Sequence, residues 1–147
     1  MFFLIGKAAV TAQANASATL DFDIRLKSRA RIQLDDGREA GLALERGGDL
    51  LSDDSGELVV RIQSAPELVS IVLCGDAHKL VVACYHLGNR HVPLQIEPGR
   101  VAYLHDHVLD EMLIGLGLIV GREQAPFEPV SGAYETASHH SHPHHSH

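Results

Sequence analysis

The spacing of apolar residues changes near Ala65-Pro66, and this change limits the possible folds more than any other feature of the sequence. Before it, apolar and polar residues alternate over short segments such as 29–34 and 58–62, and turn residues such as Asp35-Asp36-Gly37 separate these segments. A period of two predicts half-buried strands, and an Asp-Gly turn predicts a hairpin. We therefore expect residues 1–69 to form a small all-β domain.

After the change, strands and helices alternate. The apolar run at 68–73 predicts a buried strand, and Asp76 can cap a helix that stops near Gly88-Asn89. Extended segments follow at 92–96 and 100–104, then a second helix from about residue 106 and a short strand at 118–120. The order βαββαβ predicts a ferredoxin-like domain over 70–137, so the expected fold class is α+β. The apolar stripes expected to be buried on the two helices are Ala77, Leu80, Val81 and Cys84, and Val108, Leu109, Met112, Leu113 and Leu116.

The last ten residues differ in composition from the rest of the chain. Six of the eleven histidines lie in 138–147, which contain no apolar residue able to join a core. We expect a disordered His-rich tail there. It could be an affinity tag, although Ser and Pro interrupt the run, or simply a disordered end. It could also be a flexible arm that collects several metal ions weakly through interchangeable imidazoles.

Composition and charge argue against several classes of function. The net charge of −7 and the aromatic content of 5% disfavour nucleic-acid binding, which needs basic surfaces and stacking rings. No run approaches the roughly 20 apolar residues of a membrane span. No positive charge precedes the N-terminal apolar run, and Lys7 interrupts it, so we expect no signal peptide. Cys74 and Cys84 are too few for a disulfide framework, and we expect a cytoplasmic protein.

Histidine dominates the polar chemistry of the chain. The common nucleophile, phosphate-binding and zinc-protease motifs are absent from the sequence, so we do not expect an enzyme. Neutral imidazole binds zinc, copper and nickel, and ligand order alone would place copper above nickel. Cys74 and Cys84 lie on apolar stripes, where packing explains them better than metal binding does.

Two histidine positions outside the tail could hold a metal ion. His91 lies where the chain leaves the first predicted helix, so a rigid scaffold would fix it, although a lone loop histidine is often only a surface group. His105 and His107 flank Asp106, and on extended backbone both rings would share a face and could clamp an ion. The simpler alternative is that Asp106 caps a helix and the histidines flank it by chance.

The segments YHLGNRH at 85–91 and YLHDHVL at 103–109 resemble the UreE family of nickel-binding urease accessory proteins. Arg46-Gly47 and Ala65-Pro66-Glu67 are also similar to that family, so the resemblance spans nearly the whole chain. It implies a homodimer with a peptide-binding N-terminal β domain and a metal-binding ferredoxin-like domain. It further implies delivery of Ni²⁺ for assembly of the urease active site, together with the urease accessory GTPase, UreG, and urease apoprotein.

The resemblance also implies roles for individual histidines. The central nickel ligand corresponds to His91, contributed by both subunits at the dimer interface, and the secondary pair to His105 and His107. Many members of the family end in a histidine-rich tail, whose auxiliary ligands would here be His139, His140, His142, His144, His145 and His147. Histidine number and order vary between members, so individual tail ligands cannot be assigned. Zn²⁺ and Cu²⁺ are alternative ions for the same ligands.

Physical reasoning supports a shared site in one respect. A single imidazole per chain is too few for a closed coordination shell, whereas a two-fold axis brings two copies together and couples metal binding to dimerisation. Because imidazole must be neutral to coordinate, affinity should weaken below about pH 6.5. General metal storage remains an alternative. A hydrolase that uses His105, His107 and Asp110 is another, although no third ligand and base are evident together.

Overall fold

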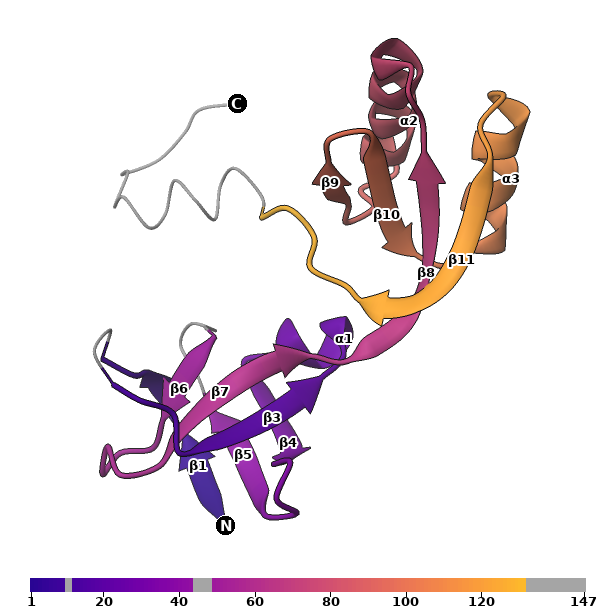
Figure 1. The fold of residues 1–147 in the computed structure, drawn as a ribbon. Coiled ribbons are helices and arrows are strands. Elements are labelled where there is room, and N and C mark those ends of the chain that lie inside the picture. The colour runs from indigo at the N-terminus through magenta and orange to yellow at the C-terminus, as the bar shows by residue number, and fades with distance from the viewer. Residues whose placement is uncertain (10–11, 44–48, 132–147) are drawn as a thin grey trace. The chain divides into compact units, whose positions relative to one another are not determined.

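The computed structural model describes residues 1–9, 12–43 and 49–131. The chain divides into two compact units (Figure 1, coloured from the N-terminus to the C-terminus). Within the described residues, the first comprises residues 1–67 and Gln124–Phe127, and the second comprises Leu68–Glu123 and residues 128–131. The division falls between Glu67 and Leu68, close to the change in the apolar pattern at Ala65-Pro66.

The first unit is built from two small sheets. One has the strand order β1 (Phe2–Leu4), β5 (Glu39–Ala43), β4 (Arg29–Gln33). The other has the order β2 (Gly6–Lys7), β6 (Leu50–Ser52), β7 (Val59–Ser64), β3 (Ala16–Leu20). β1 runs parallel to β5, and β3 runs parallel to β7. A four-residue helix, α1 (Phe22–Arg25), was not expected from the alternating pattern; Asp21 caps it by accepting from the Ile24 N–H.

The core of the first unit follows the predicted alternation. Ile32 of β4 pairs with Ala40 of β5, and both are buried. Gly37, with a φ of 95°, allows the tight turn between these strands. The remaining core comes from alternate residues of the other strands and their flanking turns, including Leu4, Ala18, Leu34, Leu42, Leu51, Leu58 and Val60.

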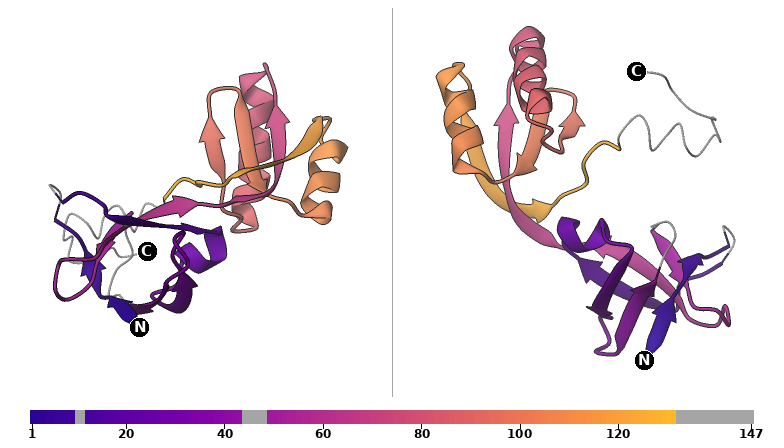
Figure 2. Two further views of the ribbon diagram at one scale, coloured as in Figure 1. Left: turned by 60° about the horizontal axis from the view of Figure 1, so that its bottom comes forward. Right: turned by 180° about the vertical axis from the view of Figure 1, so that it is seen from behind.

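The second unit has the predicted ferredoxin-like order, so the α+β fold class is confirmed. Its elements are β8 (Pro66–Leu73), α2 (Ala77–Asn89), β9 (Gln95–Glu97), β10 (Arg100–Leu104), α3 (His107–Gly115) and β11 (Val120–Pro126), although the first two residues of β8 and the last three of β11 belong to the first unit. The sheet order is β11-β8-β10-β9, and β10 is antiparallel to both of its neighbours. Both helices pack on one face of this sheet (Figures 1 and 2), because their buried residues share a core cluster with Val72, Val101 and Tyr103.

The expected helix stripes are partly wrong. Val81 and Val108 are 65% and 56% exposed, and Ala77 and Leu116 are also exposed. Both helices carry apolar residues around much of their circumference, so a period of 3.6 fits more than one face. The buried residues are Leu80, Ala83 and Leu87 on α2, and Leu109, Asp110 and Leu113 on α3.

Two strand predictions also differ from the structure. The last strand runs from Val120 to Pro126 and not over 118–120, because β11 is a sheet edge whose polar residues mask its pattern. The run at 68–73 is not wholly buried: Leu68 and Leu73 are exposed, whereas Ser70 and Val72 are fully buried.

Candidate functional site

His91 lies directly after α2, where the helix turns into the following loop. Its φ of 58° is left-handed, and among the described residues no other non-glycine residue has a positive φ. The His91 N–H donates to the Gly88 carbonyl at 3.0 Å, and the Val92 N–H donates to the Leu87 carbonyl at 3.3 Å. These two bonds form a Schellman motif. The helix stops at Asn89, as predicted, but neither Gly88 nor Asn89 takes the left-handed position that was expected of them; His91 takes it.

Helix α3 ends with the same pair of bonds. The Gly117 N–H donates to the Ile114 carbonyl at 2.9 Å, and the Leu118 N–H donates to the Leu113 carbonyl at 3.1 Å. Gly117 takes the left-handed position with a φ of 90°, as is usual, because glycine has no Cβ to clash there. His91 therefore occupies in α2 the position that glycine occupies in α3.

The backbone at His91 is strained but well anchored. A left-handed conformation costs a non-glycine residue about 1 kcal/mol or more, and such strain is concentrated at functional positions. Leu87 is fully buried and Val92 packs against the same core, so both ends of the turn are held. The His91 side chain itself is exposed. The structure thus presents one imidazole to solvent from a fixed position.

We expect His91→Gly to be more stable than His91→Ala by about 1 kcal/mol in the free energy of unfolding, because glycine relieves the left-handed strain. Urea unfolding of the metal-free variants measures this difference. The matched control is Gly117→Ala, which places a Cβ at the same position of α3 and should destabilise by a similar amount. Equal stability of His91→Gly and His91→Ala would contradict the assigned backbone strain.

His105 follows β10, and its ring points into a polar cluster. The backbone N–H of His105 donates to the Leu68 carbonyl at 3.1 Å, which fixes the backbone of His105 against β8. The Nδ1 atom lies 3.1 Å from Oδ2 of Asp110 and 3.1 Å from Oγ of Ser70. The side chain is 22% exposed, so part of the ring still reaches solvent.

Asp110 is the centre of this cluster. Its Oδ1 accepts hydrogen bonds from Ser70 Oγ at 2.6 Å and from Tyr103 Oη at 2.7 Å, and both of these donors are fully buried. Burial, and then the bond to Asp110, raises the pKa of Tyr103 well above its usual range. Sequence reasoning missed Ser70 and Tyr103; the available signal was a polar residue within each of two otherwise apolar strands.

The combination of Ser70, His105 and Asp110 is not a catalytic triad. Ser70 is fully buried and its hydroxyl donates a hydrogen bond to Asp110, so the hydroxyl cannot attack a substrate. A triad needs the base to face the nucleophile through one ring nitrogen and the acid through the other, whereas here both partners face Nδ1. The cluster positions the histidine and offers no route to acyl transfer.

His107 lies in a different environment. It is the first residue of α3, after Asp106, whose carboxylate caps the helix by accepting from the Val108 and Leu109 N–H groups. Its ring is 71% exposed, with Nε2 3.9 Å from Oε1 of Glu111. The backbone is therefore not extended throughout 105–107, and the capping role considered for Asp106 is correct. In the described part of the chain, no group of three or more His, Cys, Asp or Glu residues could hold a metal ion.

Comparison with known proteins adds the decisive observation. The family model described as the UreE urease accessory protein N-terminal domain matches residues 4–63, and that of the C-terminal domain matches residues 67–147. The chain belongs to the UreE family. The resemblance seen in the sequence is thereby confirmed.

Individual UreE relatives match most of the chain. A urease accessory protein UreE of Pseudomonas putida is 63% identical over 128 residues, which cover 84% of this chain and 80% of the relative. The Escherichia coli O157:H7 protein of the same name is 50% identical over 148 residues, covering 97% and 96%. The Citrobacter koseri protein is 51% identical over the full length of both chains.

The remaining predictions for this UreE-family chain concern its tail, the Arg46-Gly47 segment, its two cysteines and membrane spans. The tail histidines from His139 to His147 and the Arg46-Gly47 segment fall outside them. Cys74 and Cys84 are free thiols packed against the core of the second unit, and burial raises the pKa of Cys84. Among the described helices, none is long and apolar enough to cross a membrane.

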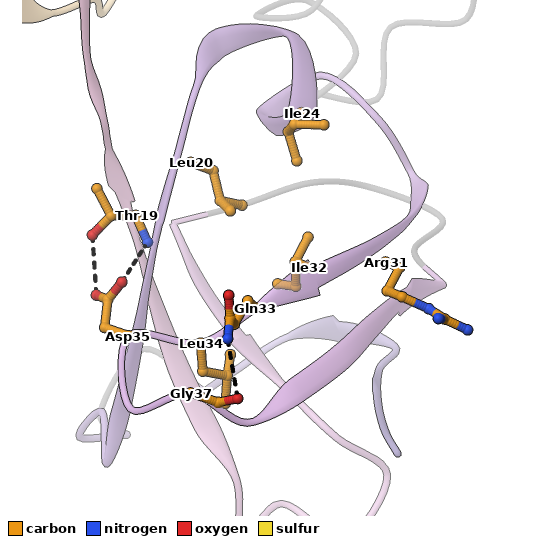
Figure 3. Close-up of a pocket in the computed structure, with 9 residues that line it drawn as sticks. All are labelled: Thr19, Leu20, Ile24, Arg31, Ile32, Gln33, Leu34, Asp35 and Gly37. Carbon is orange, nitrogen blue, oxygen red and sulfur yellow. Dashed lines mark hydrogen bonds between the residues drawn. The ribbon is translucent and has the colours of Figure 1, made fainter.

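A pocket of about 520 Å³ lies in the first unit, beside β3 and β4 (Figure 3). Asp35 at its edge accepts from Ser17 Oγ at 2.6 Å and from the Thr19 N–H at 3.1 Å, and the Ser17 bond is the main reason that the pKa of Asp35 is lowered. The lining of the pocket contains no histidine or cysteine, so the pocket does not suit a borderline metal ion. It is lined by Thr19, Leu20, Ile24, Arg31, Ile32, Gln33, Leu34, Asp35 and Gly37.

Proposed function

We propose that this UreE-family chain is a nickel metallochaperone that delivers Ni²⁺ for assembly of the urease active site. Membership of a family named for urease accessory proteins supports an accessory role in the urease system. The observation that carries the metal-binding part is His91, an exposed imidazole held in a strained conformation that glycine would adopt more easily. The chain would act by carrying an ion and not as an enzyme, and its place of action would be the cytoplasm.

The primary nickel site would be shared by two copies of the chain. One imidazole cannot complete the coordination of a divalent ion, but two His91 side chains related by a two-fold axis supply a pair of ligands. Val81 and Tyr85 favour such a homodimer: they lie one turn apart on α2, and each is 65% exposed. Large apolar side chains that are exposed together on one helix are typical of an interface.

The other histidines would act as auxiliary ligands. His105 and His107 would form a weaker or transfer site, and the tail from His139 to His147 would collect ions and raise their local concentration. A site completed by interchangeable ligands releases its ion stepwise, which suits delivery to a partner better than permanent storage. The partners would be the urease accessory GTPase, UreG, and urease apoprotein.

Nickel transfer tests this proposal against general metal storage. We expect the nickel-loaded protein to activate urease apoprotein in the presence of UreG and a chelator that removes free nickel. His91→Ala should abolish most of this activation, whereas His78→Ala, which removes an exposed histidine from the start of α2, should not. Storage predicts no metal-dependent complex with either partner, and activation equal to that by chelated nickel alone would contradict delivery.

A further inference from the structure

We propose that Asp110 is a positioning residue that keeps His105 in the tautomer with the proton on Nδ1, so that Nε2 is its metal-binding nitrogen. The part that concerns metal rests on the function proposed above, whereas the tautomer follows from the geometry alone. The geometry involves three elements: Ser70 on β8, Tyr103 and His105 at the end of β10, and Asp110 on α3.

The count of protons around Asp110 determines the tautomer. The Ser70 hydroxyl has one proton, which it uses to donate a hydrogen bond to Oδ1 of Asp110 at 2.6 Å. The Ser70 oxygen can therefore only accept from Nδ1 of His105, which lies 3.1 Å away. The Tyr103 hydroxyl likewise donates to Oδ1 at 2.7 Å, which leaves Oδ2 to face Nδ1 at 3.1 Å. Two acceptors and no donor therefore face Nδ1, and Nδ1 must carry the proton.

The lone pair of the neutral ring then lies on Nε2. Among the described residues, no buried side-chain nitrogen lacks a hydrogen-bond partner, and no described group is hydrogen-bonded to Nε2, so this atom reaches solvent. A carboxylate behind a ligating histidine fixes the ring and strengthens its binding, and loss of such a partner typically costs 10–100-fold in metal affinity. His107 has no comparable support, because its ring is 71% exposed.

The substitution Asp110→Asn should invert the tautomer. The hydroxyls of Ser70 and Tyr103 both need an acceptor, so the amide oxygen should stay with them. The amide NH₂ would then face Nδ1 and donate to it, which moves the ring proton to Nε2. The matched control is Asp106→Asn, which removes a neighbouring carboxylate whose Oδ1 accepts from N–H groups at the start of α3.

Long-range ¹H–¹⁵N correlation spectra of the metal-free full-length chain identify the tautomer directly. We expect His105 to carry its proton on Nδ1 in the unmodified protein and in Asp106→Asn, and on Nε2 in Asp110→Asn. A proton on Nε2 in the unmodified protein overturns the proposal without any variant having to fold. An unchanged tautomer in Asp110→Asn overturns it as well.

Nickel titration of the same variants, in a His91→Ala chain that ends at Ala137, separates the two parts of the account. We expect Asp110→Asn to weaken binding at His105 about 10–100-fold and Asp106→Asn to change it by less than about threefold. Binding that is equal in the two variants overturns the positioning role of Asp110. The expected tautomers without any nickel at His105 support the geometry and instead contradict the secondary nickel site in the proposed function.

Discussion

His91→Ala is expected to weaken nickel binding by more than about 100-fold in a chain that ends at Ala137. Loss of a residue that merely supports a ligand costs about 10–100-fold, and this substitution removes a ligand itself. In a shared site the substitution removes two ligands, because each chain of the dimer loses its His91 imidazole. Calorimetric titration measures the affinity, and truncation after Ala137 removes the tail that would otherwise mask the loss.

The control for this experiment is His78→Ala in the same truncated chain. His78 is an exposed histidine at the opposite end of α2, so its loss tests whether any surface imidazole matters equally. We expect its affinity to stay within about threefold of the unsubstituted chain, because a lone surface imidazole binds nickel weakly. If His91→Ala also stays within that range, or if the truncated chain binds no nickel at all, the proposed shared site is wrong.

Asp110→Ala is expected to lower the free energy of unfolding of the second unit by about 3 kcal/mol. The change leaves the fully buried hydroxyls of Ser70 and Tyr103 without their acceptor, and each unsatisfied buried group costs about 1–3 kcal/mol. Denaturant unfolding followed by amide signals of β8 and β10 measures the effect on this unit.

A triple variant distinguishes this cause from a general loss of packing. Ser70→Ala and Tyr103→Phe remove the two buried hydroxyls, so adding them to Asp110→Ala leaves neither hydroxyl without an acceptor. We expect the triple variant to be more stable than Asp110→Ala alone, because removing both partners of a buried hydrogen bond costs less than removing one. A triple variant that is less stable than the single one would show that the cluster is held mainly by packing.

The broad fold of this chain could be predicted because it depends on local periodicity. Alternation before Ala65-Pro66 and the βαββαβ order after it are properties of short segments, and the structure has both. The parallel pairing of β1 with β5 could not be predicted in this way. It joins segments nearly forty residues apart, Phe2 with Ala40, and no local pattern specifies such a partner.

The sequence indicated which residues to consider for the candidate site, but it did not indicate their backbone conformation or their contacts. His91 could be located by its place after a helix, yet its left-handed backbone could not, because Gly88 lies nearby and glycine is the usual residue in the left-handed position at a helix end. The cluster behind His105 depends on the register that sets Ser70 opposite Tyr103. It also depends on which face of α3 is buried, and this was the feature that periodicity left open.

Anomalous X-ray diffraction from crystals of the nickel-loaded full-length protein tests the central claim most directly, because data collected on both sides of the nickel absorption edge locate the ion itself. The account predicts a nickel peak on a two-fold axis between two chains, with His91 of each chain among its ligands. A nickel ion held within a single chain, or bound away from His91, would contradict it.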